Sequence, residues 1–317
     1  GGQLRLNNTT LTVGPCGAEM WLGVEVWGNP SVSQYPYSNQ SYLYMNNSSV
    51  IEHAYIGVLA ASRNGQLESP DDTEVDDYDD YYSEYGGGGR AYNSQFRNNE
   101  RDALLLNYTW YSQGNPLGNK CWFENCDFVT DGLLNHPNVL PLSHAELEAV
   151  LGIRFKNCSF RNTALFLELP IDNRGKGVYS KNSTFTVSGQ NETFNGDEGV
   201  DFQTFYRLRI GVDVVGAENH PFTVNKMEFQ LNETGIYVKG ACFETITFNN
   251  FEIPEYGNGY GNYNQGAYLM NSYLFTIEEN SFFGDSDLTR NVGLVIDNSS
   301  NNAVVDEYEV NNEVYRN

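Results

Sequence analysis

The sequence predicts a right-handed parallel β-helix, an all-β solenoid in which the chain winds through stacked coils and adds one short strand to each sheet per coil. A β-rich composition and two repeated motifs support this fold class. Aromatic residues make up 14% of the 317 residues, and Tyr, Phe, Val and Thr suit a pleated surface, whereas Asn and the 31 Gly suit tight turns. Both motifs recur along the whole chain, so we expect about ten coils in one domain over residues 1–317.

The first motif is a hexad of the form apolar, any, Asn, small, any, apolar. Its copies are LNNTTL at Leu6, MNNSSV at Met45, AYNSQF at Ala91, FENCDF at Phe123, FKNCSF at Phe155 and SKNSTF at Ser180, followed by the looser copies VDFQTF at Val200, VNKMEF at Val224, FETITF at Phe243 and IEENSF at Ile277. An Asn between apolar ends suits a sharp bend, because its side chain bonds neighbouring backbone or stacks on the Asn of the next coil. Each hexad is therefore expected to turn the chain from one sheet onto another.

The second motif, Gly-apolar-any-apolar, alternates with the hexads. It occurs as GVEV at Gly23, GVLA at Gly57, GIRF at Gly152, GVYS at Gly177, GVDV at Gly211, GIYV at Gly235, GAYL at Gly266 and GLVI at Gly293. Its period of two gives a short strand one apolar face. In GIYV, Ile236 and Val238 are expected to point inward. Tyr237 and Lys239 are expected to point outward.

The spacing of the hexads also fits a β-helix. The closest copies start about 19 to 25 residues apart, which is near the length of one coil. Wider gaps are expected to hold inserted loops, for which the candidates are residues 60–89, 112–120, 131–150 and 254–265. An antiparallel β-sandwich, the alternative fold, also has evenly spaced short strands. A sandwich gives no reason for the same Asn-containing turn to recur at equivalent places.

Two local features add detail to this layout. Residues 143–150 indicate a short helix, with Ser143 as N-cap and Glu146 at the capping-box position. Cys126 and Cys158 occupy the same position in successive hexads, so we expect them to stack in the interior. They are expected to be reduced thiols, because the spacing between adjacent strands does not by itself give disulfide geometry.

The charge of the chain excludes some partners. The formal net charge is −23, from 18 Lys and Arg against 41 Asp and Glu. Nucleic acid needs a basic footprint on the protein, and an anionic membrane surface is disfavoured for the same reason. No apolar run approaches the ~20 residues of a membrane-spanning helix. We therefore expect neither nucleic acid nor a membrane span. Five cysteines are an odd number, so at least one thiol is free or paired between chains.

Three segments resemble right-handed β-helix surface and secreted proteins of Bacteroidota, which are often exported through the type IX secretion system. They are MWLGVEVWGNPSVSQ at residues 20–34, IRFKNCSFRNT at residues 153–163, and the GIYV and ITFNNFEI units within residues 235–253. The resemblance covers nearly the full chain. It implies an extracellular or cell-surface location and a role in adhesion or matrix.

An acidic, tyrosine-rich segment is the strongest local anomaly, and it lies in the inserted loop near residues 60–89. Its carboxylates include Asp71, Asp72, Asp76, Asp77, Asp79 and Asp80. Repulsion between like charges favours a solvated loop. The alternative is a calcium site, because hard cations bind several carboxylates, and no other cofactor is expected. Deletion of residues 69–89 is expected to leave the stability nearly unchanged unless calcium binds there.

Two groups of acidic residues are the candidates for an enzyme centre. β-Helices also carry polysaccharide lyases and hydrolases, but the strings Asn-Thr-Asp, Gly-His-Gly and Arg-Ile-Lys of the pectin hydrolases do not occur. The candidate clusters are Asp197 and Glu198 with Asp201, and Asp285 and Asp287 with Arg290. The four histidines, His53, His136, His144 and His220, lack metal-binding spacing and are expected in loops and at the surface.

The sequence therefore favours a non-catalytic extracellular or cell-surface module for adhesion, structural display or protein association. Its expected partner is a surface glycan or another surface or secreted protein. The alternative is a carbohydrate-active β-helix enzyme, a polysaccharide lyase or hydrolase. An enzyme should bring acids and a base together on one exposed sheet face, whereas a display module should present outward Tyr and Asn without such convergence.

Overall fold

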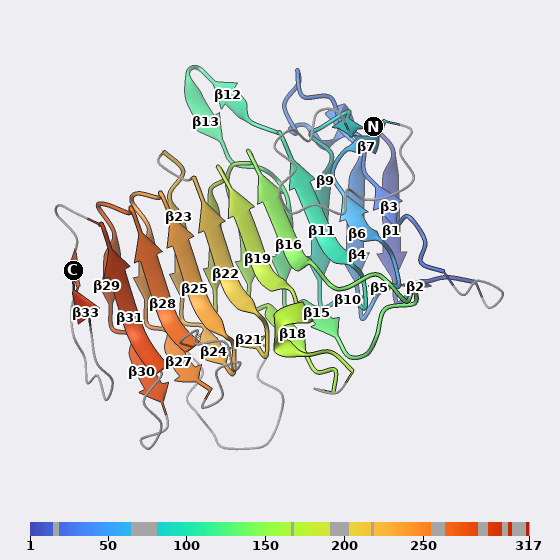
Figure 1. The fold of residues 1–317 in the computed structure, drawn as a ribbon. Helices are drawn as coiled ribbons and strands as arrows, with labels where there is room; N and C mark the ends of the chain where they lie inside the picture. The colour runs from blue at the N-terminus through green and yellow to red at the C-terminus, as the bar shows by residue number, and fades with distance from the viewer. Residues whose placement is uncertain are drawn as a thin grey trace.

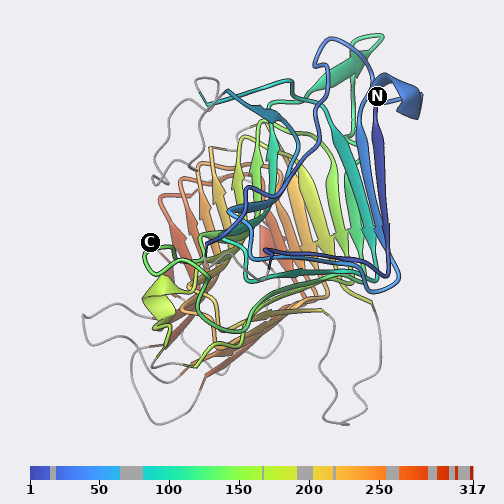
Figure 2. The same cartoon turned by 90° about the vertical axis from the view of Figure 1, so that its right-hand side faces the viewer.

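The computed structural model describes residues 1–14, 19–64, 81–165, 168–190, 203–216, 219–254, 264–284 and 291–299, and the backbone of residues 304–305 and 315–316. Over these residues the fold is a parallel β-helix with three long parallel sheets, as the sequence predicts (Figure 1). Seen from the N-terminal end, the strands of successive coils lie behind one another (Figure 2). No helix in this part of the chain is long and apolar enough to cross a membrane.

Each coil adds one strand to sheet A, then one to sheet B and one to sheet C. Sheet A contains β1 (Gln3–Asn7), β4 (Tyr42–Asn46), β9 (Gly88–Tyr92), β14 (Trp122–Glu124), β17 (Ile153–Lys156), β20 (Phe185–Ser188), β23 (Phe222–Asn225), β26 (Thr245–Thr247), β29 (Thr276–Glu278) and β32 (Val304–Val305). Sheet B contains β2 (Thr10–Leu11), β5 (Val50–Glu52), β10 (Gln95–Arg97), β15 (Asp127–Thr130), β18 (Ser159–Asn162), β21 (Thr204–Tyr206), β24 (Glu228–Gln230), β27 (Asn250–Ile253) and β30 (Ser281–Gly284). Sheet C contains β3 (Val24–Glu25), β6 (Ile56–Leu59), β11 (Arg101–Leu106), β16 (Ser143–Glu148), β19 (Lys176–Lys181), β22 (Ile210–Val215), β25 (Thr234–Lys239), β28 (Asn264–Met270), β31 (Asn291–Asp297) and β33 (Tyr315–Arg316). The ten strands of sheet A agree with the predicted number of coils.

An asparagine ladder forms the corner between sheets A and B. Asn93, Asn125 and Asn157 occupy the same turn position, with φ of 47°, 52° and 52°. Asn125 Nδ2 donates to Asn93 Oδ1 at 3.0 Å, and Asn157 Nδ2 donates to Asn125 Oδ1 at 3.1 Å. In the first two coils Asn47 donates instead to Asn7, which precedes its equivalent Asn8, at 2.7 Å. Asn adopts the left-handed backbone more readily than other side-chain-bearing residues, so one residue type supplies both the bend and the stack, as predicted.

Two of the hexad assignments are wrong in detail. SKNSTF begins within β19 at Ser180 and reaches β20 at Phe185, so it lies at the corner between sheets C and A. The copy assigned to Phe243 is displaced by three residues, because the equivalent turn begins at Ile246, which pairs with Val224. The first three residues of VDFQTF lie outside the described residues.

The coils also differ in length more than the hexad spacing predicts. The step from Val224 to its partner Ile246 is 22 residues, within the expected range. The step from Phe123 to Phe155 is 32 residues. The strands themselves stay short, so the additional residues lie in the connections between the sheets.

The glycine motif forms the strands of sheet C, except that Gly152 precedes β17 of sheet A. Equivalent positions of adjacent strands form a glycine strip of Gly177, Gly211, Gly235, Gly266 and Gly293. A Cβ on Gly235 would lie 2.4 Å from the Gly266 carbonyl oxygen and 2.8 Å from a ring carbon of Phe251. Glycine is therefore required because backbone and an aromatic ring fill the space of a side chain. Ile236 and Val238 are fully buried and Lys239 is exposed, as predicted.

A phenylalanine ladder from sheet B packs against the glycine strip inside the solenoid. It consists of Phe96, Phe128, Phe160, Phe205, Phe229, Phe251 and Phe282. Neighbouring rings stack with centroids 4.6 to 4.9 Å apart. This distance matches the separation of neighbouring strands in a sheet, so each ring lies directly on the ring of the previous coil.

Cys126 and Cys158 confirm the predicted coil alignment. Both are fully buried free thiols at equivalent positions of adjacent coils, and the Ser159 amide donates to the Cys126 carbonyl at 3.0 Å. Burial raises the pKa of the Cys158 thiol, and the neighbouring Cys126 raises it further. Both features favour the protonated, reduced thiol.

The helix predicted for residues 143–150 is wrong. Ser143–Glu148 forms β16, which pairs with β11 on one side and β19 on the other. Ala145 and Leu147 are fully buried, so this segment has the period of a strand rather than of a helix. Pairing with two neighbouring strands outweighs a local capping signal, because a helix this short is marginal on its own.

The insertions predicted after Ser112 and Asp131 differ in form. The first is a projecting hairpin of β12 (Trp110–Ser112) and β13 (Asn115–Leu117) (Figure 1). The second ends before β16 and so covers residues 131–142 only. In the fourth predicted insertion, residues 255–263 lie outside the described residues.

The loop near residues 60–89 contributes to packing, contrary to the prediction. β7 (Ser62–Arg63) pairs antiparallel with β8 (Tyr82–Ser83). Tyr82 and Tyr85 are buried against Leu104 and Leu106 on the outer face of sheet C. The expectation that residues 69–89 add almost nothing to the core is therefore wrong for residues 81–89, which include the start of β9. Residues 65–80 lie outside the described residues.

Candidate functional site

The acidic groups singled out from the sequence lie outside the described residues. They are Asp71, Asp72, Asp76, Asp77, Asp79 and Asp80 of the calcium hypothesis, and Asp197, Glu198, Asp201, Asp285, Asp287 and Arg290 of the enzyme hypothesis. Within the part of the chain that the structure describes, no group of three or more His, Cys, Asp or Glu side chains is placed to hold a metal ion. The calcium site therefore stays a prediction.

The outer face of sheet C brings acids and bases together. Lys176 Nζ lies 2.6 Å from Asp213 Oδ2 and 4.1 Å from the centre of the Tyr179 ring. On the same face, Lys181 Nζ lies 3.4 Å from Glu148 Oε1. These contacts join neighbouring strands, as cross-strand ion pairs do in other sheets. The residue types suit acid–base chemistry, but each lysine is already held by a carboxylate.

Tyrosines continue this face toward the C-terminal coils. The rings of Tyr237 and Tyr268 stack with centroids 5.5 Å apart, and the Tyr268 hydroxyl donates to Asp297 Oδ2 at 3.0 Å. Burial raises the pKa of Tyr179, and neighbouring carboxylates raise it further, Asp213 most strongly. Tyr179 is therefore a neutral hydrogen-bond donor at physiological pH rather than a phenolate base.

A buried aspartate–histidine pair interrupts the glycine strip. Asp102 and His144 occupy the positions equivalent to Gly177 in the two preceding coils. His144 Nδ1 lies 2.6 Å from Asp102 Oδ2, and Asn99 Nδ2 donates to Asp102 Oδ1 at 2.7 Å. Burial raises the pKa of Asp102, while the hydrogen bonds from His144 and Asn99 oppose the rise. His144 is only 5% exposed, so the prediction of a loop or surface histidine is wrong and the pair is structural.

Arg101 forms a second buried polar group beside this pair. Its side chain is 1% exposed, and its Nε donates to Glu146 Oε2 at 2.8 Å. Glu100 Oε1 lies 3.1 Å from another guanidinium nitrogen, and the Ser143 hydroxyl donates to Glu146 Oε2 at 3.1 Å. A buried guanidinium needs such carboxylate partners, because removing one partner leaves an uncompensated charge.

Sheet A carries a column of alternating arginine and aromatic side chains on its outer face. This arginine–aromatic stripe consists of Arg5, Tyr44, Arg90, Trp122 and Arg154, on the adjacent strands β1, β4, β9, β14 and β17. The apolar residue that follows each of them is buried, so alternation along the strand directs the stripe outward. Arg5 and Arg154 are exposed, and the three residues between them are partly exposed.

Two donors of the stripe have no partner in the described chain. The Arg5 guanidinium carbon lies 5.3 Å from the centre of the Tyr44 ring. The ring of Tyr92, beside the stripe, lies 6.0 Å from that of Trp122. Among the described residues, none bonds to Trp122 Nε1, and none bonds or pairs with the Arg154 side chain. The indole nitrogen is buried, whereas the exposed Arg154 guanidinium is placed to meet a ligand.

The charge of this face is opposite to that of the whole chain. The five strands of the stripe contain four cations, Arg5, Arg90, Arg154 and Lys156, and one anion, Glu124. Lys156 Nζ lies 2.7 Å from Glu124 Oε1, and its side chain is 45% exposed. The face is therefore locally cationic on a protein of net charge −23.

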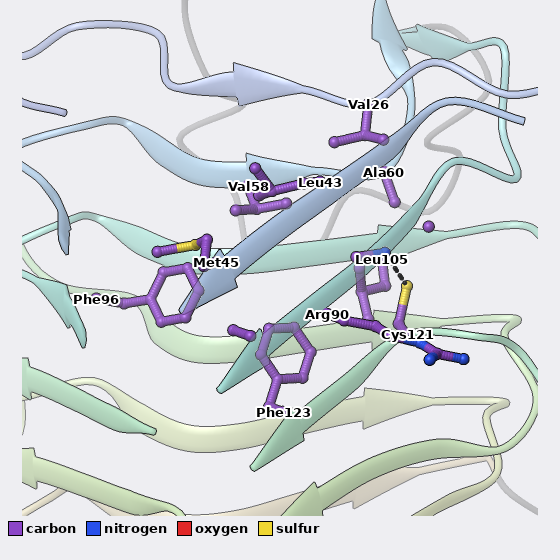
Figure 3. A pocket seen from close by; sticks show the side chains of 13 residues that line it. Val26, Leu43, Met45, Val58, Ala60, Arg90, Phe96, Leu105, Cys121 and Phe123 are labelled. Carbon is purple, nitrogen blue, oxygen red and sulfur yellow. Dashed lines mark hydrogen bonds between the residues drawn. The ribbon is translucent and has the colours of Figure 1, made fainter. Parts of the chain in front are cut away.

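The interior of the N-terminal coils contains a small cavity of about 10 Å³ (Figure 3). Met45, Phe96 and Phe123 are among the apolar side chains that line it. Cys121 also lines it, and its sulfur accepts a hydrogen bond from the Gly89 amide at 3.2 Å. Burial raises the pKa of the Cys121 thiol to about 12. A cavity of this size is about that of one water probe, so it is a packing gap rather than a ligand site.

Sequence reasoning overlooked the stripe, although a signal for it exists. Each of its five residues directly precedes a hexad, in the copies that begin at Leu6, Met45, Ala91, Phe123 and Phe155. Aligning the hexads places Arg, Tyr, Arg, Trp and Arg in one column.

No family model, curated protein or solved structure matches the chain.

Proposed function

We propose that this chain is a non-catalytic module of a secreted or cell-surface protein and that it binds glycans through the outer face of sheet A. The observation that carries the proposal is the arginine–aromatic stripe. Its aromatic rings are partly exposed and its arginine side chains reach solvent. The resemblance to exported β-helix proteins of Bacteroidota supports the location.

The chemistry of the stripe suits sugars. Tyr and Trp present large rigid surfaces at low entropic cost, and their polar atoms add hydrogen bonds. The C–H face of a pyranose ring packs on such a ring, while its hydroxyls accept bonds from guanidinium N–H groups. Parallel pairing and stacked interior rings fix the strands, so the backbone positions that carry these groups are set before a ligand arrives.

The test compares the loss of two rings on two faces. Binding of the chain to immobilised neutral and acidic polysaccharides is measured for Tyr44→Ala/Trp122→Ala and for the control Tyr237→Ala/Tyr268→Ala on sheet C. Binding should fall at least about tenfold in the first variant and persist in the second. Circular dichroism establishes that both are folded. Equal loss in the two variants, or no binding of any glycan by the unaltered chain, would contradict the proposal.

A polysaccharide lyase or hydrolase is the second candidate. It is favoured by one observation, the cluster of Lys176, Tyr179 and Asp213 on the outer face of sheet C. The same polysaccharides are assayed for new reducing ends and for the absorbance of unsaturated products. Turnover that disappears in Lys176→Met, while binding persists, would transfer the function to this cluster.

A further inference from the structure

We propose that the arginine–aromatic stripe binds a linear acidic polysaccharide that lies along the axis of the β-helix, with acidic groups at the arginines and sugar rings on the aromatic residues between them. The inference rests on the proposed glycan-binding function and names its ligand class. The spacing, the charge and the donor chemistry of the stripe support it.

The spacing of the arginines matches an alternating polymer. Neighbouring coils are separated by about one strand spacing, and the rings of Phe96 and Phe128 stack at 4.8 Å. Arg5, Arg90 and Arg154 lie on the first, third and fifth coils, so they recur about every 10 Å. In an extended glycan with alternating ring orientation, acidic groups on one side recur once per disaccharide. Two coils are close to this repeat.

The aromatic residues occupy the intervening coils. Tyr44 lies between Arg5 and Arg90, and Trp122 lies between Arg90 and Arg154. A glycan whose acidic groups meet the arginines therefore places the sugars between them over the two rings. This alternation explains why cations and rings share one column instead of forming separate patches.

The charges favour an anionic ligand of moderate charge density. The stripe is cationic, whereas the chain as a whole carries −23 and repels dense polyanions. A nucleic acid brings one phosphate per nucleotide and needs an extensive basic footprint. A polysaccharide with one acidic group per disaccharide on the bound side matches the three arginines instead.

Arginine also supplies the appropriate donor geometry. A guanidinium presents a planar set of N–H donors that fits a carboxylate or a sulfate bidentately. Arg154 is exposed and no described residue holds it, so its donors are open to a ligand. Nearby, Lys156 forms an ion pair with Glu124. The carboxylate of Glu124 lowers the net positive charge of the face.

The experiment uses polygalacturonate and its fully methyl-esterified form, which share a backbone and differ in charge. Chondroitin sulfate serves as the sulfated probe and a single-stranded DNA oligonucleotide as the competing polyanion. The chain should bind polygalacturonate, chondroitin sulfate or both, bind the ester at least about tenfold more weakly, and lose affinity as salt screens the charges. The acidic probe that binds more tightly identifies carboxylate or sulfate as the preferred group.

Three variants locate the site. Arg154→Gln should weaken binding of the acidic glycan about tenfold. Lys239→Gln, which removes one exposed cation from sheet C, should leave binding unchanged. Glu124→Gln should strengthen binding, because it removes the anion of the face and frees Lys156.

The outcomes separate this inference from the proposed function. Equal binding of polygalacturonate and its ester, with the aromatic residues still required, overturns the acidic ligand and leaves glycan binding standing. Absence of binding to every glycan overturns both. DNA bound as tightly as the acidic glycans, or equal effects of Arg154→Gln and Lys239→Gln, also overturns the inference.

Discussion

Glu244 places a carboxyl group inside an aromatic column of the core. It directly precedes Thr245, which pairs with Thr223 and Thr276, so it lies level with the buried Phe222 and Phe275. The side chain is 1% exposed, and neither carboxyl oxygen has a hydrogen-bond partner within the described residues. Burial raises its pKa from 4.5 to about 7.

The stability of the protein should therefore fall as the pH rises from about 4.5 to 7. A raised pKa means that the native state holds the proton more tightly than the unfolded chain, so the full stability is present below pH 4.5. Between these two pH values the free energy of unfolding should fall by about 3 kcal/mol. Urea unfolding at pH 4 and pH 8 measures it, and Glu244→Gln should remove most of the difference. The control Glu278→Gln, at a partly exposed position on the next coil, should retain it. If the stability of the wild type and of Glu244→Gln changed equally with pH, Glu244 would not be the cause of the pH dependence.

The Asp102–His144 pair makes a second prediction at the residue scale. His144→Gly alone should destabilise the protein by about 3 kcal/mol, because it leaves the Asp102 carboxylate buried without its histidine. The double variant Asp102→Gly/His144→Gly should lose less than the sum of the two single variants, because it extends the glycine strip through these coils. Chemical unfolding of the two single variants and the double variant measures the coupling energy between Asp102 and His144. Additive losses would show that the two side chains act independently.

The glycine strip makes a prediction at the scale of the strand. In β25, Gly235→Ala forces a methyl group against the Gly266 carbonyl and the Phe251 ring, which should cost about 1–3 kcal/mol. The control is Gly132→Ala, where nothing lies within 4 Å of the added carbon. Thermal unfolding should show a lower midpoint for the first variant and an unchanged midpoint for the second. Equal midpoints would mean that sheet C shifts to accept a side chain.

The elements also show what the sequence can predict and what it cannot. The hexads locate the corner between sheets A and B because Asn125 and its equivalents meet a backbone requirement that few other residues meet. The strand β16 is missed because Ser143 and Glu146 imitate a helix cap. Asp102 and His144 replace the expected glycines and so conceal two copies of the second motif.

The stripe and the ion pairs of sheet C are harder to predict for a different reason. The alternation of apolar and polar residues along the sequence indicates where a strand lies and which of its residues point outward. Which outward residues become neighbours depends on the register between coils, and connections of unequal length conceal that register. Trp122 and Arg154 are 32 residues apart in the chain yet adjacent in the sheet.

At the scale of the whole molecule, the stack behaves as a one-dimensional array. Each coil contacts mainly its neighbours, so energetic coupling should fall off along the axis. Phe229→Leu and Phe251→Leu remove stacked rings 4.6 Å apart and should couple by about 1 kcal/mol. Phe96→Leu and Phe251→Leu lie on distant coils and should be additive within about 0.5 kcal/mol. Double-mutant cycles from chemical unfolding test both pairs, and equal coupling in the two pairs would contradict this description.

The 22-residue coil between Val224 and Ile246 has a consequence for the size of such a protein. Residues 224–245 contain one complete passage through the three sheets, with Phe229 and Gly235 at their ladder positions. A tandem copy of this segment places Phe229 on Phe229 and Gly235 on Gly235, so it adds a coil without creating a new kind of contact. Each copy lengthens the molecule by about 4.8 Å. The length of the molecule is therefore set in whole-coil steps, by duplication of a segment rather than by changes to the contacts within it.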